Sequence, residues 1–100
     1  MKIRSGRIGG SYSETDWTLE DPSGGVKTVR RHVDFGDDDF SEGPCVVLGI
    51  VHLDTAYTQN VRVNATAENI TNNGFDVVFT TWADSKTYGV QADWLAYVCP

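Results

Sequence analysis

The side chains best suited to binding chemistry are one arginine and two aromatic residues in the second half of the chain. Arg62 lies near the start of an alternating segment, Trp82 ends the next one, and Tyr88 follows a short polar loop. A planar guanidinium offers fixed donors to neighbouring hydroxyl oxygens. An aromatic ring offers a flat apolar surface to the C–H face of a sugar. These residue types indicate a carbohydrate site, provided that the fold brings them together.

The same residues also have a structural interpretation. Trp82 and Tyr88 can close one end of a hydrophobic core, and Arg62 can pair with an acid such as Asp84. The residues alone leave both interpretations open.

Four segments predict the strands that must position these residues. The run CVVLGIVHL at 45–53 is rich in β-branched residues, and we expect it to be a largely buried strand. Residues 61–68, 75–82 and 90–98 alternate between apolar and polar positions, which is typical of strands with one buried face. The sequence NNG at 72–74 is a turn signal. No stretch has a sustained helical period, so the sequence predicts an all-β antiparallel sandwich.

In an antiparallel order, the start of one strand lies beside the end of its neighbour. Arg62, Trp82 and Tyr88 are therefore predicted to converge at one end of the sandwich. Alternate residues of the last strand are expected to face the core: Val90, Ala92, Trp94, Ala96 and Val98. The intervening residues are expected to point outward: Gln91, Asp93, Leu95 and Tyr97. Leu95 and Tyr97 would then be exposed unless another subunit covers them.

Length and charge restrict the classes of partner. One hundred residues, 40% of them apolar, predict a single domain over 1–100 with one modest core. The net charge of −6, from 14 acidic and 8 basic residues, argues against nucleic acid and anionic membranes as partners. No apolar run approaches the roughly 20 residues of a membrane span, so membrane insertion is not expected.

Common catalytic and metal-binding motifs are not found in the sequence. CxxC, HExxH and G-x-S-x-G do not occur, and the isolated His32 and His52 are expected to be structural or solvent-exposed. The DPSGG loop at 21–25 lacks the Gly-Lys-Ser/Thr ending of a phosphate loop. We therefore expect no enzyme, metal or cofactor. A small hydrolase with an unrecognised site is a weaker alternative.

The sequence contains two cysteines, which alone do not decide the cellular compartment. Cys45 begins one predicted strand and Cys99 follows the last, so an antiparallel pairing of these strands would allow a disulfide. Two free thiols or an intermolecular bond are the alternatives.

Acceptor tripeptides for N-glycosylation at Asn64 and Asn69 favour secretion. The N-terminal sequence lacks the apolar stretch of a signal peptide, so the chain is either cytoplasmic or numbered from a removed signal.

The order of motifs from Pro44 to Val98 resembles the H-type lectin family. The resemblance rests on PCVVLGIVHLD, on QNVRVNATAENITNNGFDVVFTTWADSKTY and on a late Trp, with weaker collinear matches at SGRI, DPSGG and Phe35. It implies a six-stranded antiparallel β-sandwich assembled as a homotrimer or homohexamer. It further implies a secreted, non-enzymatic lectin that takes part in agglutination and innate defence. Such lectins bind galactose or N-acetylgalactosamine-type glycans between subunits, without metal.

The resemblance also implies roles for particular residues. Arg62 matches the family's sugar-binding arginine, Trp82 its aromatic wall, and Tyr88 the tyrosine across the hairpin. Ala83 departs from the family, because its snail members often carry His directly after this Trp.

The loop after Asp-Pro departs as well, since it carries no acid where the snail proteins have a hydroxyl acceptor. Asp21 and Asp84 are the candidate replacements, and the backbone N–H of Gly24 or Gly25 is a candidate donor to an acetyl carbonyl. The alternative is a structural oligomerisation or adhesion domain with lost or changed sugar specificity.

Overall fold

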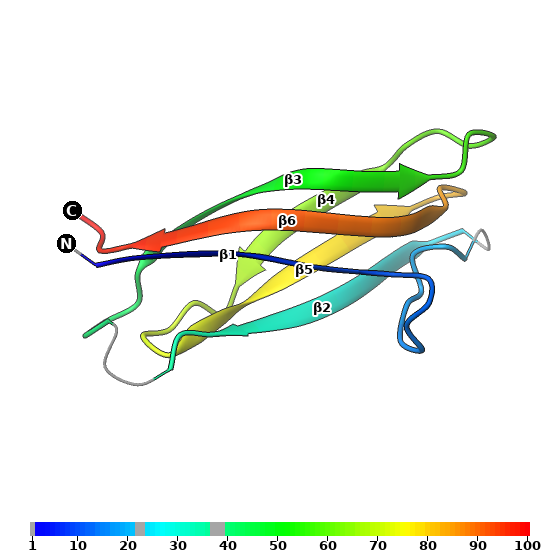
Figure 1. The fold of residues 1–100 in the computed structure, drawn as a ribbon. Helices are drawn as coiled ribbons and strands as arrows, with labels where there is room; N and C mark the ends of the chain where they lie inside the picture. Colours follow the sequence, from blue (N-terminus) through cyan, green and yellow to red (C-terminus); the bar gives the residue numbers. More distant parts are fainter. Residues whose placement is uncertain (1, 22–23, 37–39) are drawn as a thin grey trace.

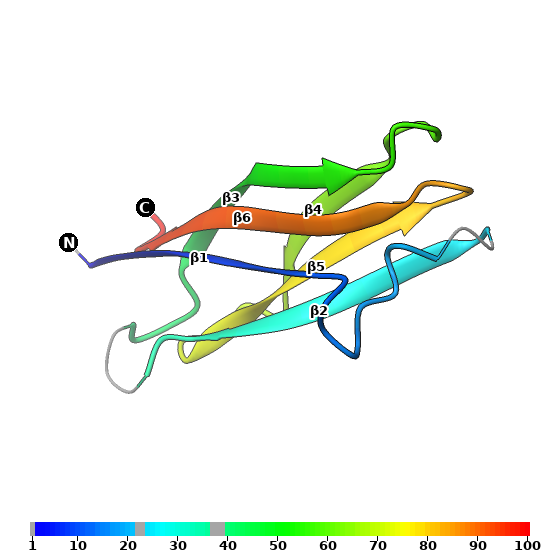
Figure 2. The same cartoon turned by 45° about the vertical axis from the view of Figure 1, so that its right-hand side comes forward.

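The computed structural model describes residues 2–21, 24–36 and 40–100. Its regular elements are β1 (Ile3–Ser11), β2 (Val26–Asp34), β3 (Cys45–Thr55), β4 (Val63–Glu68), β5 (Gly74–Trp82) and β6 (Thr87–Tyr97). They form two antiparallel sheets, with strand orders β1-β6-β3 and β2-β5-β4 (Figure 1). Figure 2 shows the two sheets as separate layers of an elongated sandwich. The predicted all-β, six-stranded antiparallel fold is confirmed.

The centre of the sandwich is built by the middle strand of each sheet. Phe75, Val77 and Phe79 alternate along β5 and are fully buried, as their spacing predicted. Three residues of β6 are also fully buried: Val90, Ala92 and Ala96. Each middle strand lies between two neighbours in its own sheet, and its inward side chains pack against the opposite sheet.

An aromatic cluster closes the core near the chain termini. The Trp94 ring lies 5.4 Å from that of Phe75 and 5.8 Å from that of Phe35, measured between ring centroids. Gly6 lies against the Trp94 indole, where a Cβ would come within 2.9 Å of the ring. Only glycine lets the β1 backbone approach the indole so closely.

The strand β3 is more exposed than the sequence predicted. It pairs only with β6 and forms the edge of its sheet. Val47 and Val51 expose 55% and 50% of their surfaces. The prediction of a largely buried strand at 45–53 is therefore wrong for the single chain, because an edge strand leaves apolar residues open to solvent.

Two predicted strand ends also differ from the structure. β4 begins at Val63, opposite Thr81, so Val61 precedes the ladder and is half-exposed. β6 ends at Tyr97, and Val98 beyond it exposes 49% of its surface instead of facing the core. In both cases the apolar alternation of the sequence extends beyond the residues that are paired in the sheet.

Cys45 and Cys99 form a disulfide within the chain, with their Cα atoms 5.1 Å apart. The strands β3 and β6 are antiparallel neighbours, and Cys45 lies opposite Tyr97, two positions before Cys99. This is the intrachain pairing that the strand order favoured over free or intermolecular thiols. In the described ranges, no helix has the length and apolar character needed to cross a membrane.

Candidate functional site

One end of the β2-β5-β4 sheet brings together three of the predicted site segments. The register pairs Val26 of β2 with Trp82 of β5, and Val63 of β4 with Thr81. The glycine pair at 24–25 precedes β2, and Arg62 precedes β4. Trp82 therefore lies between the glycine turn and Arg62. The predicted proximity of Arg62 and Trp82 follows from β4 and β5 being antiparallel neighbours.

Arg62 is held in place by two oxygen acceptors from the loop between β5 and β6. Its Nη1 donates to Asp84 Oδ1 at 2.7 Å and to Ser85 Oγ at 3.1 Å. The hydrogen bond from Arg62 lowers the pKa of Asp84, so this carboxyl is ionised at neutral pH. The pairing of Arg62 with an acid, the structural interpretation, is thus present. It also leaves a guanidinium and a carboxylate side by side next to Trp82, which is 39% exposed.

The loop conformation that presents Asp84 depends on a left-handed residue. Ala83 has a φ of 58°, and the Ser85 N–H donates to the Trp82 carbonyl across the turn at 3.4 Å. Gly24 and Gly25 also have positive φ, of 88° and 78°. A side chain is disfavoured in this region, so glycine suits both positions.

Lys27 ties the two loops to each other, and the sequence reasoning missed it. Its side chain is buried, and its Nζ donates to the carbonyls of Asp21, Ala83 (3.2 Å) and Ser85 (3.4 Å). A buried ammonium needs such acceptors. The sequence does offer one signal for this burial. Lys27 lies two positions before the buried Val29, so the two side chains point to the same face of β2.

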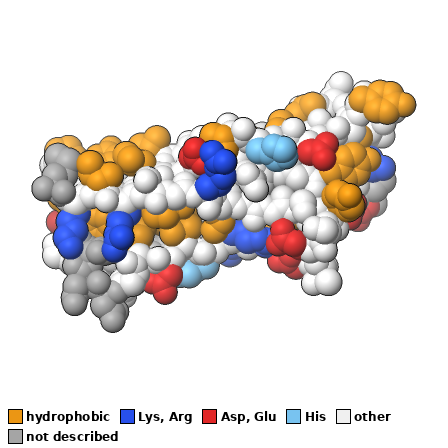
Figure 3. All heavy atoms as spheres, viewed as in Figure 1, with side chains coloured by type: hydrophobic (Ala, Val, Ile, Leu, Met, Phe, Trp, Pro, Cys, Tyr) orange, Lys and Arg blue, Asp and Glu red, His pale blue; other side chains and the backbone are white. Residues whose placement is uncertain are grey.

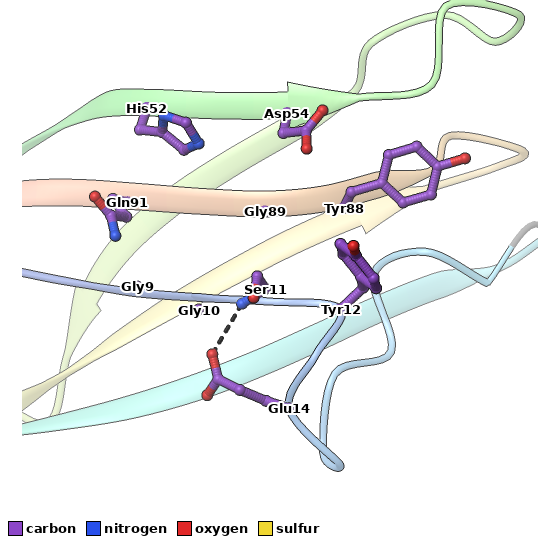
Figure 4. A pocket seen from close by; sticks show the side chains of 10 residues that line it. All are labelled: Gly9, Gly10, Ser11, Tyr12, Glu14, His52, Asp54, Tyr88, Gly89 and Gln91. Carbon is purple, nitrogen blue, oxygen red and sulfur yellow. Dashed lines mark hydrogen bonds between the residues drawn. The ribbon is translucent and has the colours of Figure 1, made fainter.

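Tyr88 lies at the same end of the sandwich but in the other sheet. Its ring makes an edge contact with that of Tyr12, with centroids 6.1 Å apart. Both tyrosines border a pocket of about 260 Å³ on the outer face of the β1-β6-β3 sheet (Figure 4). The three predicted residues are therefore divided between two places, with Arg62 and Trp82 in one and Tyr88 in the other.

Within the described ranges, no three His, Cys, Asp or Glu side chains are grouped so that they could hold a metal ion. Both histidines are solvent-exposed, as expected. His32 Nδ1 lies 2.8 Å from Asp76 Oδ1.

Comparisons of the sequence identify one family and several relatives. Residues 30–97 match the model of the H-type lectin domain. A Fuscovulum blasticum protein, ATP synthase subunits region ORF 7, is 40% identical over 72 residues, which are 72% of this chain and 62% of that protein. Discoidin-2 of Dictyostelium discoideum is 38% identical over 74 residues, which are 72% of this chain and 28% of discoidin-2. The chain thus spans less than two thirds of either relative.

Solved structures agree with this assignment. Discoidin II of Dictyostelium discoideum superposes with a TM-score of 0.79 and 29% identity, over 94% of this chain and 35% of that one. An R1-type pyocin tail fibre superposes with a TM-score of 0.56 and 17% identity, over 95% of this chain and 70% of the fibre. The fibre therefore shares the fold alone.

Proposed function

Because the chain belongs to the H-type lectin family, we propose that it is a carbohydrate-binding lectin whose sugar site is built around Arg62 and Trp82. The observation that carries this proposal is their position at one sheet end, with the Asp84 carboxylate bonded to the guanidinium. This end combines an exposed aromatic face, hydrogen-bond donors and an ionised acceptor. Those are the groups that a sugar ring requires.

The chemistry of the site favours a galactose-type sugar. The Arg62–Asp84 and Arg62–Ser85 bonds use Nη1, and the other N–H groups of this guanidinium suit two adjacent hydroxyl oxygens. Asp84 exposes 65% of its side chain and can accept from a sugar hydroxyl. Trp82 supplies the surface for the apolar ring face, and the small Ala83 leaves room beside it. These features support galactose or N-acetylgalactosamine as ligands.

The glycine turn supplies the further contact that an acetamido sugar needs. Gly24 and Gly25 precede the residue paired with Trp82, so their N–H groups are suited to an acetyl carbonyl. Asp21 is exposed, and its backbone carbonyl is already bonded to Lys27. Asp84 is the better replacement for the missing loop acid, because its carboxylate is bonded to the guanidinium of Arg62.

The proposal includes a secreted homotrimer, or a multiple of it, with sites between subunits. Val47 and Leu95 lie opposite each other on the outer face of the β1-β6-β3 sheet and expose 55% and 39% of their surfaces. Such apolar exposure favours contact with another copy. A disulfide is typical of oxidising compartments. Several sites on one assembly raise avidity by roughly 10²–10⁴-fold, which suits agglutination and defence.

A structural oligomerisation domain is the second candidate, and one observation favours it. Arg62 Nη1 is already satisfied by Asp84 and Ser85, so this arginine has a structural role without any sugar. A glycan array separates the two candidates, because a purely structural domain retains no glycan that galactose or N-acetylgalactosamine displaces.

Substitution of Arg62 tests the site itself. Arg62→Ala should abolish binding of N-acetylgalactosamine in calorimetry while the melting temperature stays within a few degrees, since this ion pair is near the surface. Arg7→Ala is the matched control, because Arg7 pairs with Asp93 on the outer face of the other sheet. Trp82→Ala should lower both affinity and stability. Unchanged affinity in Arg62→Ala would show that the site lies elsewhere.

A further inference from the structure

We propose that the sugar site at Arg62 and Trp82 continues along the outer face of the β2-β5-β4 sheet, where Thr80 and Asn64 bind a second, uncharged sugar ring. The inference rests on the function proposed above and adds the class of ligand, which is a neutral glycan of at least two rings. The register of β4 and β5 carries it.

Thr80 and Trp82 point out of the same side of β5. Phe79 and Thr81 are fully buried, so the residues that alternate with them face outward. Thr80 lies two positions before Trp82, which separates the two residues by about 7 Å along the strand. This separation is comparable to the step from one ring to the next in a glycan. A second ring that follows the strand from Trp82 therefore meets Thr80.

Asn64 stands beside Thr80 on the neighbouring strand, because the register of β4 and β5 pairs the two residues directly. Ala65, the next residue of β4, packs against the core, so the exposed side chain of Asn64 faces outward. Directly paired residues of antiparallel strands have Cβ atoms about 4.5–5.5 Å apart. A hydroxyl group and a carboxamide at this separation can reach two hydroxyl groups of one sugar ring.

Both side chains have hydrogen-bonding capacity to spare. Neither the Thr80 hydroxyl nor the Asn64 carboxamide has a hydrogen-bond partner among the residues that the structure describes. The hydroxyl donates and accepts, and the carboxamide offers two N–H donors and a carbonyl acceptor. Thr66, two positions further along β4, differs from them because its hydroxyl already donates to Glu68 at 3.3 Å.

Arg30 closes this strip of free polar groups at its far end. It donates to Asp76 of β5 at 3.0 Å and to Glu68 of β4 at 3.2 Å, so its guanidinium crosses over β5 from β2. Val78, which pairs with Arg30, exposes only 5% of its surface. The stretch from Trp82 to Val78 covers four positions, or about 14 Å. That length suits two rings, one on Trp82 and one on Thr80.

The charges along the strip favour a neutral second ring. Arg30 is bonded to Glu68 and Asp76, so it offers no free charge to a carboxylate or sulfate on a sugar. Arg62 is likewise paired with Asp84. A sialylated or sulfated ring would bring a further negative charge near these carboxylates without gaining a partner.

The β2-β5-β4 face remains open in the proposed assembly. The proposed contact between copies uses Val47 and Leu95, which lie on the other sheet of the sandwich (Figure 1). Asn64 also belongs to an acceptor tripeptide for N-glycosylation, and a glycan attached there would cover the strip. Binding is therefore measured on protein made in the bacterial periplasm, where the disulfide forms and Asn64 stays unmodified.

The test compares one ring with two by calorimetry. The probes are methyl N-acetyl-α-D-galactosaminide and a panel of neutral disaccharides, in which N-acetylgalactosamine is joined by an α or a β bond to each hydroxyl of methyl galactoside. We expect the wild type to bind at least one disaccharide about tenfold more tightly than the single ring, because two further hydrogen bonds contribute about this much. A sulfated form of that disaccharide should lose the gain.

Thr80→Val and Thr66→Val are the matched pair of variants. Both replace an outward hydroxyl with a methyl group and keep the β-branched shape that suits a strand. Thr80→Val and Asn64→Ala should each reduce the ratio of disaccharide to single-ring affinity from about tenfold to about twofold or less. Thr66→Val should keep the wild-type ratio, because its hydroxyl is already bonded to Glu68. Taking the ratio within each variant cancels any change that affects both ligands.

Failure of the second-ring subsite differs from failure of the site itself. If the wild type binds the single ring but no disaccharide more tightly, the subsite is overturned while the site at Arg62 and Trp82 stands. Equal ratios in Thr80→Val and Thr66→Val would also overturn the subsite. A wild type that binds none of the probes would overturn the proposed function, and the subsite with it.

Discussion

The two sheets present different outer faces to their surroundings. On the β2-β5-β4 face, Asp76 accepts hydrogen bonds from His32 (2.8 Å), Arg30 (3.0 Å) and Asn69 (3.1 Å). Arg30 also reaches Glu68 on the neighbouring strand at 3.2 Å. Such cross-strand polar pairs make a face that is stable in water.

The β1-β6-β3 face combines one exposed ion pair with exposed apolar side chains. Arg7 Nε donates to Asp93 Oδ1 at 2.6 Å near the middle of the sheet. Ile3, Val47 and Leu95 are exposed toward the end that holds the chain termini. Figure 3 views this face and shows hydrophobic side chains together with charged ones. One face is therefore covered by paired polar groups around Asp76, whereas the other leaves apolar side chains open to solvent.

The largest effect is expected when a charge is placed among the exposed apolar side chains of the β1-β6-β3 face. Leu95→Asp places a charge opposite Val47, so it should convert the proposed trimer into monomers in light scattering. Agglutination by these monomers should be poor, whatever remains of monosaccharide affinity. Thr28→Asp is the control, since Thr28 is exposed on the β2-β5-β4 sheet opposite Thr80. A wild-type chain that is monomeric at micromolar concentration would contradict the assembly.

The next effect concerns the edge strand of the same sheet. Replacing Cys45 and Cys99 with serine opens a loop of 54 residues, for which the chain-entropy estimate is about 4 kcal/mol of unfolding free energy. Urea denaturation of the variant and the wild type measures this loss. A non-reduced digest of the wild type should contain the two cysteine peptides linked. A dimer band that disappears with reductant would instead indicate a bond between chains.

A smaller effect is expected where the two sheets meet. Lys27→Met removes the donor shared by the carbonyls of Asp21, Ala83 and Ser85. Leaving such acceptors without a donor costs on the order of 1–3 kcal/mol. Sugar affinity should fall as well, because both loops beside Trp82 lose their common anchor. Lys86→Met is the control in urea denaturation and calorimetry. Equal effects of the two variants would show that the buried contacts contribute nothing specific.

The central strands were predictable because local pattern and tertiary environment agree there. Phe75, Val77 and Phe79 alternate with more polar residues, and each occupies a buried position in the middle of a sheet. β3 was misjudged because an apolar edge strand has the same composition as a buried one. β1 has almost no apolar alternation, so its nine residues gave no pattern to recognise. Its strand conformation depends on pairing with β6 and not on a pattern in its own sequence.

The candidate site was only partly predictable, for a related reason. Arg62 and Trp82 lie together because adjacent antiparallel strands place them so, and sequence order already suggests that pairing. The placement of Tyr88 depends on a bulge, which exists only relative to a partner strand. Lys27 depends on carbonyls from two distant loops. Such contacts cannot be read from the spacing of residues along one strand.

The smallest expected effect is a difference in pH dependence between the two faces. Hydrogen bonds from His32, Asn69 and Arg30 lower the pKa of Asp76 from 3.8 to about 2. The pKa of Asp93 is also lowered, by its hydrogen bond with Arg7. A carboxyl whose folded pKa is depressed adds stability above its unfolded pKa, and this stability is lost as pH falls through the folded pKa.

The contribution of Asp76 should therefore be complete above about pH 4 and disappear toward about pH 2. Asp76→Asn should lower the urea midpoint at pH 7 and flatten its dependence on pH between those values, so that variant and wild type converge in acid. Asp93→Asn should produce a smaller change, because Asp93 has one partner and is half-exposed. Urea midpoints measured from pH 2 to 7 give both slopes. A larger effect at Asp93 would reverse the comparison and place the stronger polar network on the β1-β6-β3 face.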